Sequence, residues 1–76
     1  MKELIQSICS HLVENPDGIR ITEFLGEKTL IYELRCEPND VGKLIGKNGR
    51  TVSAMRTLVS TVASRKGKRA VLEVVQ

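Results

Sequence analysis

The stretch from Val41 to Val52, VGKLIGKNGRTV, constrains this chain more than any other. An apolar turn runs into two glycines, Gly46 and Gly49. They bracket Lys47 and Asn48, and an amphipathic segment follows at once. Glycine permits a sharp backbone turn and leaves no side chain to hold a ligand away. A helix beginning here points free N–H groups and the positive end of its dipole at the turn, which suits a sugar-phosphate backbone.

The positive charge of the chain is concentrated in its second half. Residues 1–40 hold four basic and eight acidic side chains, whereas residues 41–72 hold eight basic ones and no acid. The eight are Lys43, Lys47, Arg50, Arg56, Arg65, Lys66, Lys68 and Arg69. Such concentration indicates a polyanionic partner better than the net charge of +3 does. A solvated helix face would explain residues 65–69 alone, but overlap with the glycine motif favours ligand contact for Lys43, Lys47 and Arg50.

Length and composition exclude several classes of protein. Seventy-six residues predict one domain over 1–76, without a membrane span or signal peptide, so we expect a cytoplasmic protein. Cys9 and Cys36 are too few for a metal site. No set of residues typical of catalysis is visible, so we expect no enzyme, no cofactor and no metal. The segment 42–48 resembles a P-loop but has three residues between its glycines where four are needed, and Asn48 replaces the magnesium-binding Ser or Thr.

Hydrophobic periodicity and chain-breaking residues predict six elements. Leu30, Tyr32 and Leu34 alternate with mostly charged neighbours, as in a strand buried on one face. A helical stripe is made by Val52, Met55, Val59 and Val62, and Leu58 widens it. The predicted elements are a helix over 2–14, strands over 19–25 and 29–37, a short helix carrying Val41, Leu44 and Ile45, a helix from 50 or 51 to 65, and a strand over 70–75.

Capping residues and element order complete this prediction. Asn39 or Asp40 is expected to cap the short helix, and Gly67 to follow the last turn of the long one. The order helix–strand–strand–helix–helix–strand predicts an α+β fold. In it, a three-stranded mixed sheet carries three helices on one face.

This order and the glycine motif resemble the type II KH fold over essentially the whole chain. Leu44 and Ile45 precede Gly46, and Val52 lies three residues after Gly49, as in the KH signature. The chain is most similar to the small single-domain bacterial KH proteins of the KhpA (YlqC-like) family. That resemblance implies a single-stranded RNA-binding protein or RNA chaperone. It also implies a homodimer, and pairing with a larger Jag/KhpB-type KH protein.

The resemblance also implies a binding site. Gly46, Lys47, Asn48 and Gly49 would clamp about four nucleotides, with the N–H groups of Arg50 and Thr51 behind them. The floor of a base-binding groove, between the helical pair and the central strand, would be formed by Val41, Leu44, Ile45 and Val52. Lys43 and Arg56 would be electrostatic neighbours of the RNA.

Two other interpretations remain open. The glycine pair also fits a tight turn between packed helices, and the apolar floor would be apolar in any helical pair. A KH fold that serves mainly for dimerisation or docking is therefore one alternative, and its binding would be insensitive to loop charge. A DNA-binding helix-turn-helix is the other, although its turn usually carries one glycine and the apolar stripe of the second helix occupies positions wanted for base-reading side chains.

Overall fold

The computed structural model describes residues 1–75. The elements are α1 (Lys2–Leu12), β1 (Arg20–Leu25), β2 (Thr29–Arg35), α2 (Val41–Ile45), α3 (Arg50–Arg65) and β3 (Arg69–Val74). Three short 3₁₀ turns, Pro16–Gly18, Pro38–Asp40 and Lys47–Gly49, connect them. All six predicted elements are confirmed in type and order. None of the helices within residues 1–75 is both long and apolar enough to cross a membrane.

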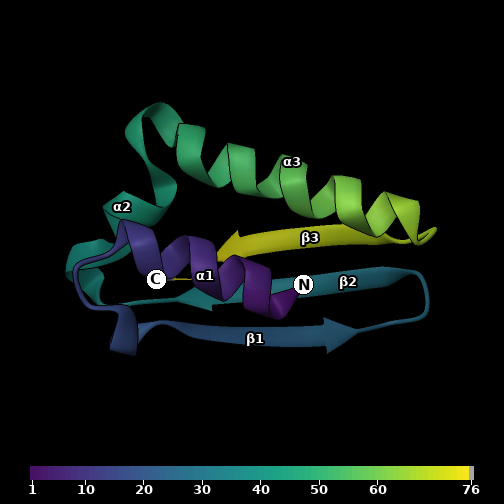
Figure 1. Ribbon diagram of the computed structural model, residues 1–76, viewed down its shortest axis with the longest axis horizontal. Coiled ribbons are helices and arrows are strands. Elements are labelled where there is room, and N and C mark those ends of the chain that lie inside the picture. Colours follow the sequence, from purple (N-terminus) through teal and green to yellow (C-terminus); the bar gives the residue numbers. More distant parts are fainter. Residues whose placement is uncertain (76) are drawn as a thin grey trace.

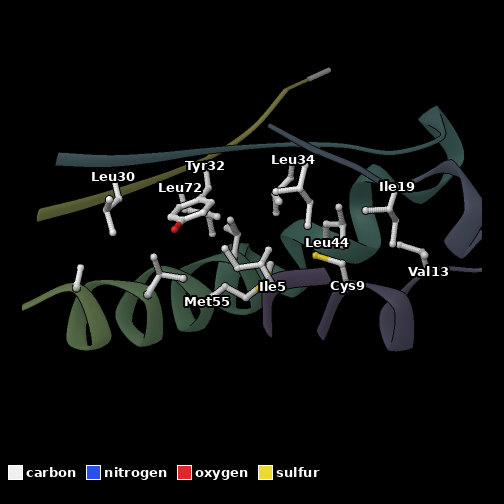
Figure 2. Packing of buried hydrophobic residues seen from close by; sticks show 14 residues of the cluster. Ile5, Cys9, Val13, Ile19, Leu30, Tyr32, Leu34, Leu44, Met55 and Leu72 are labelled. Atoms are coloured by element: carbon white, nitrogen blue, oxygen red, sulfur yellow. The ribbon is translucent and has the colours of Figure 1, made fainter. Parts of the chain in front are cut away.

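The sheet is mixed, as predicted, with the strand order β1-β2-β3. β1 runs antiparallel to β2, which follows from the short turn between them, whereas β3 returns parallel to β2 after the helical pair. Figure 1 shows α3 lying along β3. Figure 2 shows the buried side chains between the strands on one side and the helices on the other. No helix within residues 1–75 covers the opposite face of the sheet, so the predicted layering is confirmed.

The core forms where the apolar stripes of the helices meet the apolar face of the sheet. Leu30, Tyr32 and Leu34 of β2 are buried, as their alternation predicts. The helices contribute Ile5, Cys9, Leu44, Val52, Met55, Val59 and Ala63. The prediction that Leu58 belongs to this stripe is wrong, because its side chain is 39% exposed. Ala63 lies in the core instead, four residues after Val59, so the buried stripe continues along the other flank of the helix.

The ends of four elements differ from the predicted ones. α1 ends two residues early because Val13 takes an extended conformation and buries its side chain. β2 ends at Arg35, which pairs with Arg20 at the first position of β1, so no partner is left for a longer strand. β1 begins one residue later than predicted, and β3 begins and ends one residue earlier. These shifts leave the order and the register of the buried faces unchanged.

Candidate nucleic-acid interface

The glycine motif forms a tight turn between α2 and α3 with three residues in left-handed or related conformations. Gly46 has φ 79° and ψ 172°, Asn48 has φ 57°, and Gly49 has φ 73°. The Gly46 N–H donates to the Gly42 carbonyl at 2.8 Å and ends α2, and the Gly49 N–H donates to the Gly46 carbonyl at 3.1 Å. Asn is, after Gly, among the residues that tolerate a positive φ best. The sequence at these positions therefore matches the backbone that the turn requires.

The two glycines are required for different reasons. A Cβ atom at Gly46 would collide with the side chain of Thr51 and lie 2.8 Å from its backbone nitrogen. Nothing lies within 4 Å of the place where a Cβ atom of Gly49 would be. Gly46 thus lets the turn pack against the first residues of α3. Gly49 leaves open space beside the backbone, into which a ligand can approach.

The exposed part of the turn is rich in hydrogen-bond donors. Lys47, Asn48 and Arg50 are exposed, and neither cation forms an ion pair with any residue of 1–75. The N–H groups of Lys47 and Asn48 have no backbone acceptor within the same residues. Thr51 is half-buried against Gly46 in the first turn of α3. Donors from the backbone and from side chains therefore surround one small surface, an arrangement suited to an anion.

Lys43 differs from the other cations of the motif because it is already paired within the protein. Its Nζ lies 2.9 Å from Oε1 of Glu14 and 3.4 Å from Oδ1 of Asp40. The hydrogen bond to Glu14, with the nearby charges, raises the pKa of Lys43 above its ordinary value. Lys43 belongs to α2, which leads into the turn, but two carboxylates compete with any external anion for this ammonium group.

Asp40 is buried and joins Lys43 to the chain after α1, a role that the sequence did not predict. It stands at the N-cap position of α2, as predicted, yet its side chain makes no capping bond. Its carboxylate instead accepts the N–H groups of Glu14 at 3.2 Å and Asn15 at 3.1 Å. Burial alone would raise the pKa of Asp40, but these N–H groups and Lys43 outweigh it and hold the pKa below its ordinary value. Asp40 thus fastens the start of α2 to the chain that follows α1.

The predicted apolar floor divides into two layers. Leu44 is fully buried and Val52 nearly so, and both belong to the core. Val41 and Ile45 are half-buried, and their remaining surface faces outward. The strand beside the helical pair is β3, an edge strand, rather than the predicted central strand. Any groove beside the turn therefore borders a free sheet edge.

Arg56 lies where α3 meets that edge. Its Nε donates to the carbonyl of Leu72 at 3.0 Å. Arg69 donates its N–H group to Lys28, just before β2, and Val75 donates to Leu34 of β2. Leu72, at the alternate position of β3, therefore presents its backbone to the outer edge. Arg56 is therefore tied to the edge of β3.

Comparison with known proteins assigns the chain to a family. A family model described as "KhpA/KhpB, KH domain" matches residues 2–74. The chain belongs to this KhpA/KhpB KH-domain family. The α+β arrangement observed here agrees with that assignment, so the resemblance noted from the sequence is confirmed. Because the helical pair belongs to a KH domain, the alternative of a DNA-binding helix-turn-helix protein is excluded.

Several curated relatives match along nearly their whole length. A protein named RNA-binding protein KhpA of Chlamydia pneumoniae is 47% identical over 76 residues, which are all of this chain and 97% of the relative. Its namesake in Clostridium perfringens is 43% identical over 75 residues, which are 99% of this chain and all of the relative. Another, in Aquifex aeolicus, is 42% identical over 76 residues, with all of this chain and 96% of the relative covered. No solved structure shows significant similarity to the chain.

Proposed function

We propose that this chain is a non-enzymatic, cytoplasmic protein that binds single-stranded RNA and acts as an RNA chaperone. The observation that carries the proposal is the turn at residues 46–49. Its left-handed backbone, open space at Gly49 and free N–H groups form a donor surface for phosphate. The relatives described above are named RNA-binding protein KhpA, which supports the same function.

Each residue of the turn has a distinct role in this proposal. Gly46 shapes the turn, and Gly49 lets the RNA backbone approach. Lys47 supplies charge, and Asn48 supplies hydrogen bonds. Arg50 and Thr51 begin α3 and direct the positive end of its dipole at the phosphate. The Arg50 N–H, expected from the sequence to face the RNA, instead donates to the Lys47 carbonyl. One such clamp holds about four nucleotides, so sequence selectivity should be limited and affinity should fall as salt rises.

The apolar residues act in two layers in the same proposal. Val41 and Ile45 contact the bases with their exposed surface. Leu44 and Val52 hold that layer in place from the core. Lys43 and Arg56 add positive potential, Lys43 less so because of its carboxylate partners.

The experiment that tests the clamp is RNA binding by Gly49→Asp, compared with Gly67→Asp. Both glycines have a positive φ, 73° and 71°, and open space at the Cβ position, so the two variants carry similar strain and the same charge change. Only the first lies in the turn. With single-stranded RNA of about five nucleotides, Gly49→Asp should lose binding and Gly67→Asp should keep it. Equal affinities in the two folded variants would contradict the clamp.

We also propose a homodimer, and pairing with a larger Jag/KhpB-type KH protein. A hollow of about 380 Å³ between α1 and α3 favours an apolar contact. It is lined by Ile8, Leu12, Arg50, Thr51, Ala54, Met55 and Leu58. Sedimentation of Leu58→Glu against Phe24→Glu, a change at an exposed apolar residue of β1, tests this surface. A dimer that persists in the first variant and dissociates in the second would place the contact on the sheet instead.

A further inference from the structure

The end of α3 farthest from the turn carries a second group of cations, which the proposed clamp does not use. Lys28 of the β1–β2 turn and Arg69 at the start of β3 lie next to each other, because the Arg69 N–H donates to the Lys28 carbonyl at 2.7 Å. Figure 1 shows that the β1–β2 turn, the end of α3 and the start of β3 meet at one end of the molecule. We call this group the far cluster. Its members are Lys28, Arg65, Lys66, Lys68 and Arg69.

The far cluster is exposed and unneutralised. Lys28, Arg65, Lys66 and Arg69 are exposed and Lys68 is half-buried. None of the five forms an ion pair with a residue of 1–75. Lys43, in contrast, is held between two carboxylates. Glu27, in the same turn as Lys28, is the acid nearest to the cluster in sequence. Unpaired cations grouped on one surface create a positive potential, which attracts a polyanion.

A shallow trough leads from Ser53, near the start of α3, to Arg65 of the far cluster. It runs along α3, has a volume of about 560 Å³ and contains no acidic side chain in its lining. The lining residues are Ser53, Arg56, Thr57, Ser60, Thr61, Ser64 and Arg65. The hydroxyls of Thr57 and Thr61 donate to carbonyls of their own helix, whereas those of Ser53, Ser60 and Ser64 donate to no residue of 1–75. A sugar-phosphate chain lying there would therefore meet hydroxyls and cations without a repelling charge.

The length of α3 sets the size of the ligand. Sixteen residues span about 24 Å, and the clamp holds its few nucleotides at the start of this helix. An RNA that contacts both ends must therefore extend well beyond the nucleotides in the clamp.

We propose that the far cluster is a second, sequence-independent phosphate-binding surface, and that RNA held at the turn continues along α3 to reach it. This inference rests on the proposed function, since the turn supplies the first point of contact. The protein then distinguishes long single strands from short ones by charge, without reading additional bases.

The test compares Lys66→Gln/Lys68→Gln with Lys2→Gln/Arg35→Gln. Each variant removes two cations, and the control removes them from α1 and β2. Lys68 is half-buried, and the other three side chains are exposed. Binding is measured with unstructured RNAs of about five and about fifteen nucleotides at several salt concentrations, with circular dichroism to verify folding. For the long RNA, the first variant should bind about tenfold more weakly, and its salt slope should fall by about 1.4, or 0.7 for each lost contact. For the short RNA, both variants should match the wild type.

Three results would overturn this inference. The long RNA could bind the Lys66/Lys68 variant as it binds the wild type. The control could weaken the long RNA equally, which would indicate a general effect of net charge. The short RNA could also lose affinity in the first variant only, which would place these cations at the clamp. Failure of the proposed function would give a separate result: the Gly49→Asp variant would bind the short RNA as tightly as the wild type.

Discussion

The two ends of α3 present positive charge to solvent by different means. Just before its start, the N–H groups of Lys47 and Asn48 have no backbone acceptor within residues 1–75, and open space lies beside Gly49. At its end, Gly67 also has a positive φ, but the N–H groups there turn inward, since those of Gly67 and Lys68 donate to Ser64 and Ala63. The N–H groups of both glycines are therefore used within the protein, and only the turn before α3 leaves the N–H groups of two neighbouring residues without a backbone acceptor within residues 1–75. In our proposal, binding at the start depends on backbone shape, and binding at the end depends only on the number of cations.

The largest effect should come from Gly46→Ala. The backbone at Gly46 lies in a region that is essentially restricted to glycine, and a Cβ atom would strike Thr51. We expect a loss of unfolding free energy on the order of 3 kcal/mol or more, together with loss of RNA binding. Chemical denaturation measures the first and fluorescence anisotropy the second. A stable variant with unaltered RNA affinity would show that the shape of the turn is not what RNA recognises.

Two alanine substitutions separate the effect of the turn's shape on RNA binding from the effect of backbone strain on stability. Gly49→Ala and Gly67→Ala should each cost about 1–2 kcal/mol of unfolding free energy, because each places a Cβ atom in a left-handed conformation with open space around it. Only Gly49→Ala should weaken the binding of short RNA. Denaturation curves and binding isotherms for both variants check this. If both variants lowered RNA affinity equally, the turn before α3 would not be the specific site of RNA binding.

The Asp40 network predicts an acid-dependent stability. Because the folded-state pKa of Asp40 lies below its ordinary value of 3.8, its stabilising effect is complete above that pH and disappears as pH falls through the folded value. Asp40→Asn should therefore destabilise the protein at neutral pH. The difference from the wild type should narrow as the pH falls below about 3.8, the value for an unfolded Asp. Urea denaturation across that range provides the measurement, and a difference independent of pH would exclude the network as its source.

The smallest expected effect is on the salt dependence of RNA affinity when Lys43 or Lys47 is replaced. Replacement of Lys47 by Gln should reduce the slope of log affinity against log salt by about 0.7, the value for one phosphate contact with a single strand. Lys43→Gln should reduce it less, because Glu14 and Asp40 already hold that ammonium group. Equal slopes would indicate that Lys43 leaves its carboxylate partners when RNA binds.

Much of the fold could be predicted because its signals are local. The alternation of Leu30, Tyr32 and Leu34 defines the buried face of β2, and Gly67 marks the end of α3. The shape of the turn also follows from local sequence, since Gly46, Asn48 and Gly49 occupy the positions with positive φ.

The remaining features depend on distant parts of the chain. Asp40 bonds to the backbone N–H groups of Glu14 and Asn15, which lie 26 and 25 residues away and carry no side-chain signal. The pairing of Lys43 follows from the same contact. Which flank of α3 is buried, at Ala63 and not at Leu58, and which strand lies beside the helical pair depend on how the layers pack.

The central claim is that the turn at residues 46–49 is where the protein holds RNA, and the double substitution Lys47→Asp/Asn48→Asp tests it most directly. Both side chains are exposed, so the fold should survive, as circular dichroism can verify. The measurement is the affinity for short single-stranded RNA at two salt concentrations, relative to the wild type. The account predicts a loss of affinity of about tenfold or more. A folded double variant that binds short RNA as tightly as the wild type would contradict it.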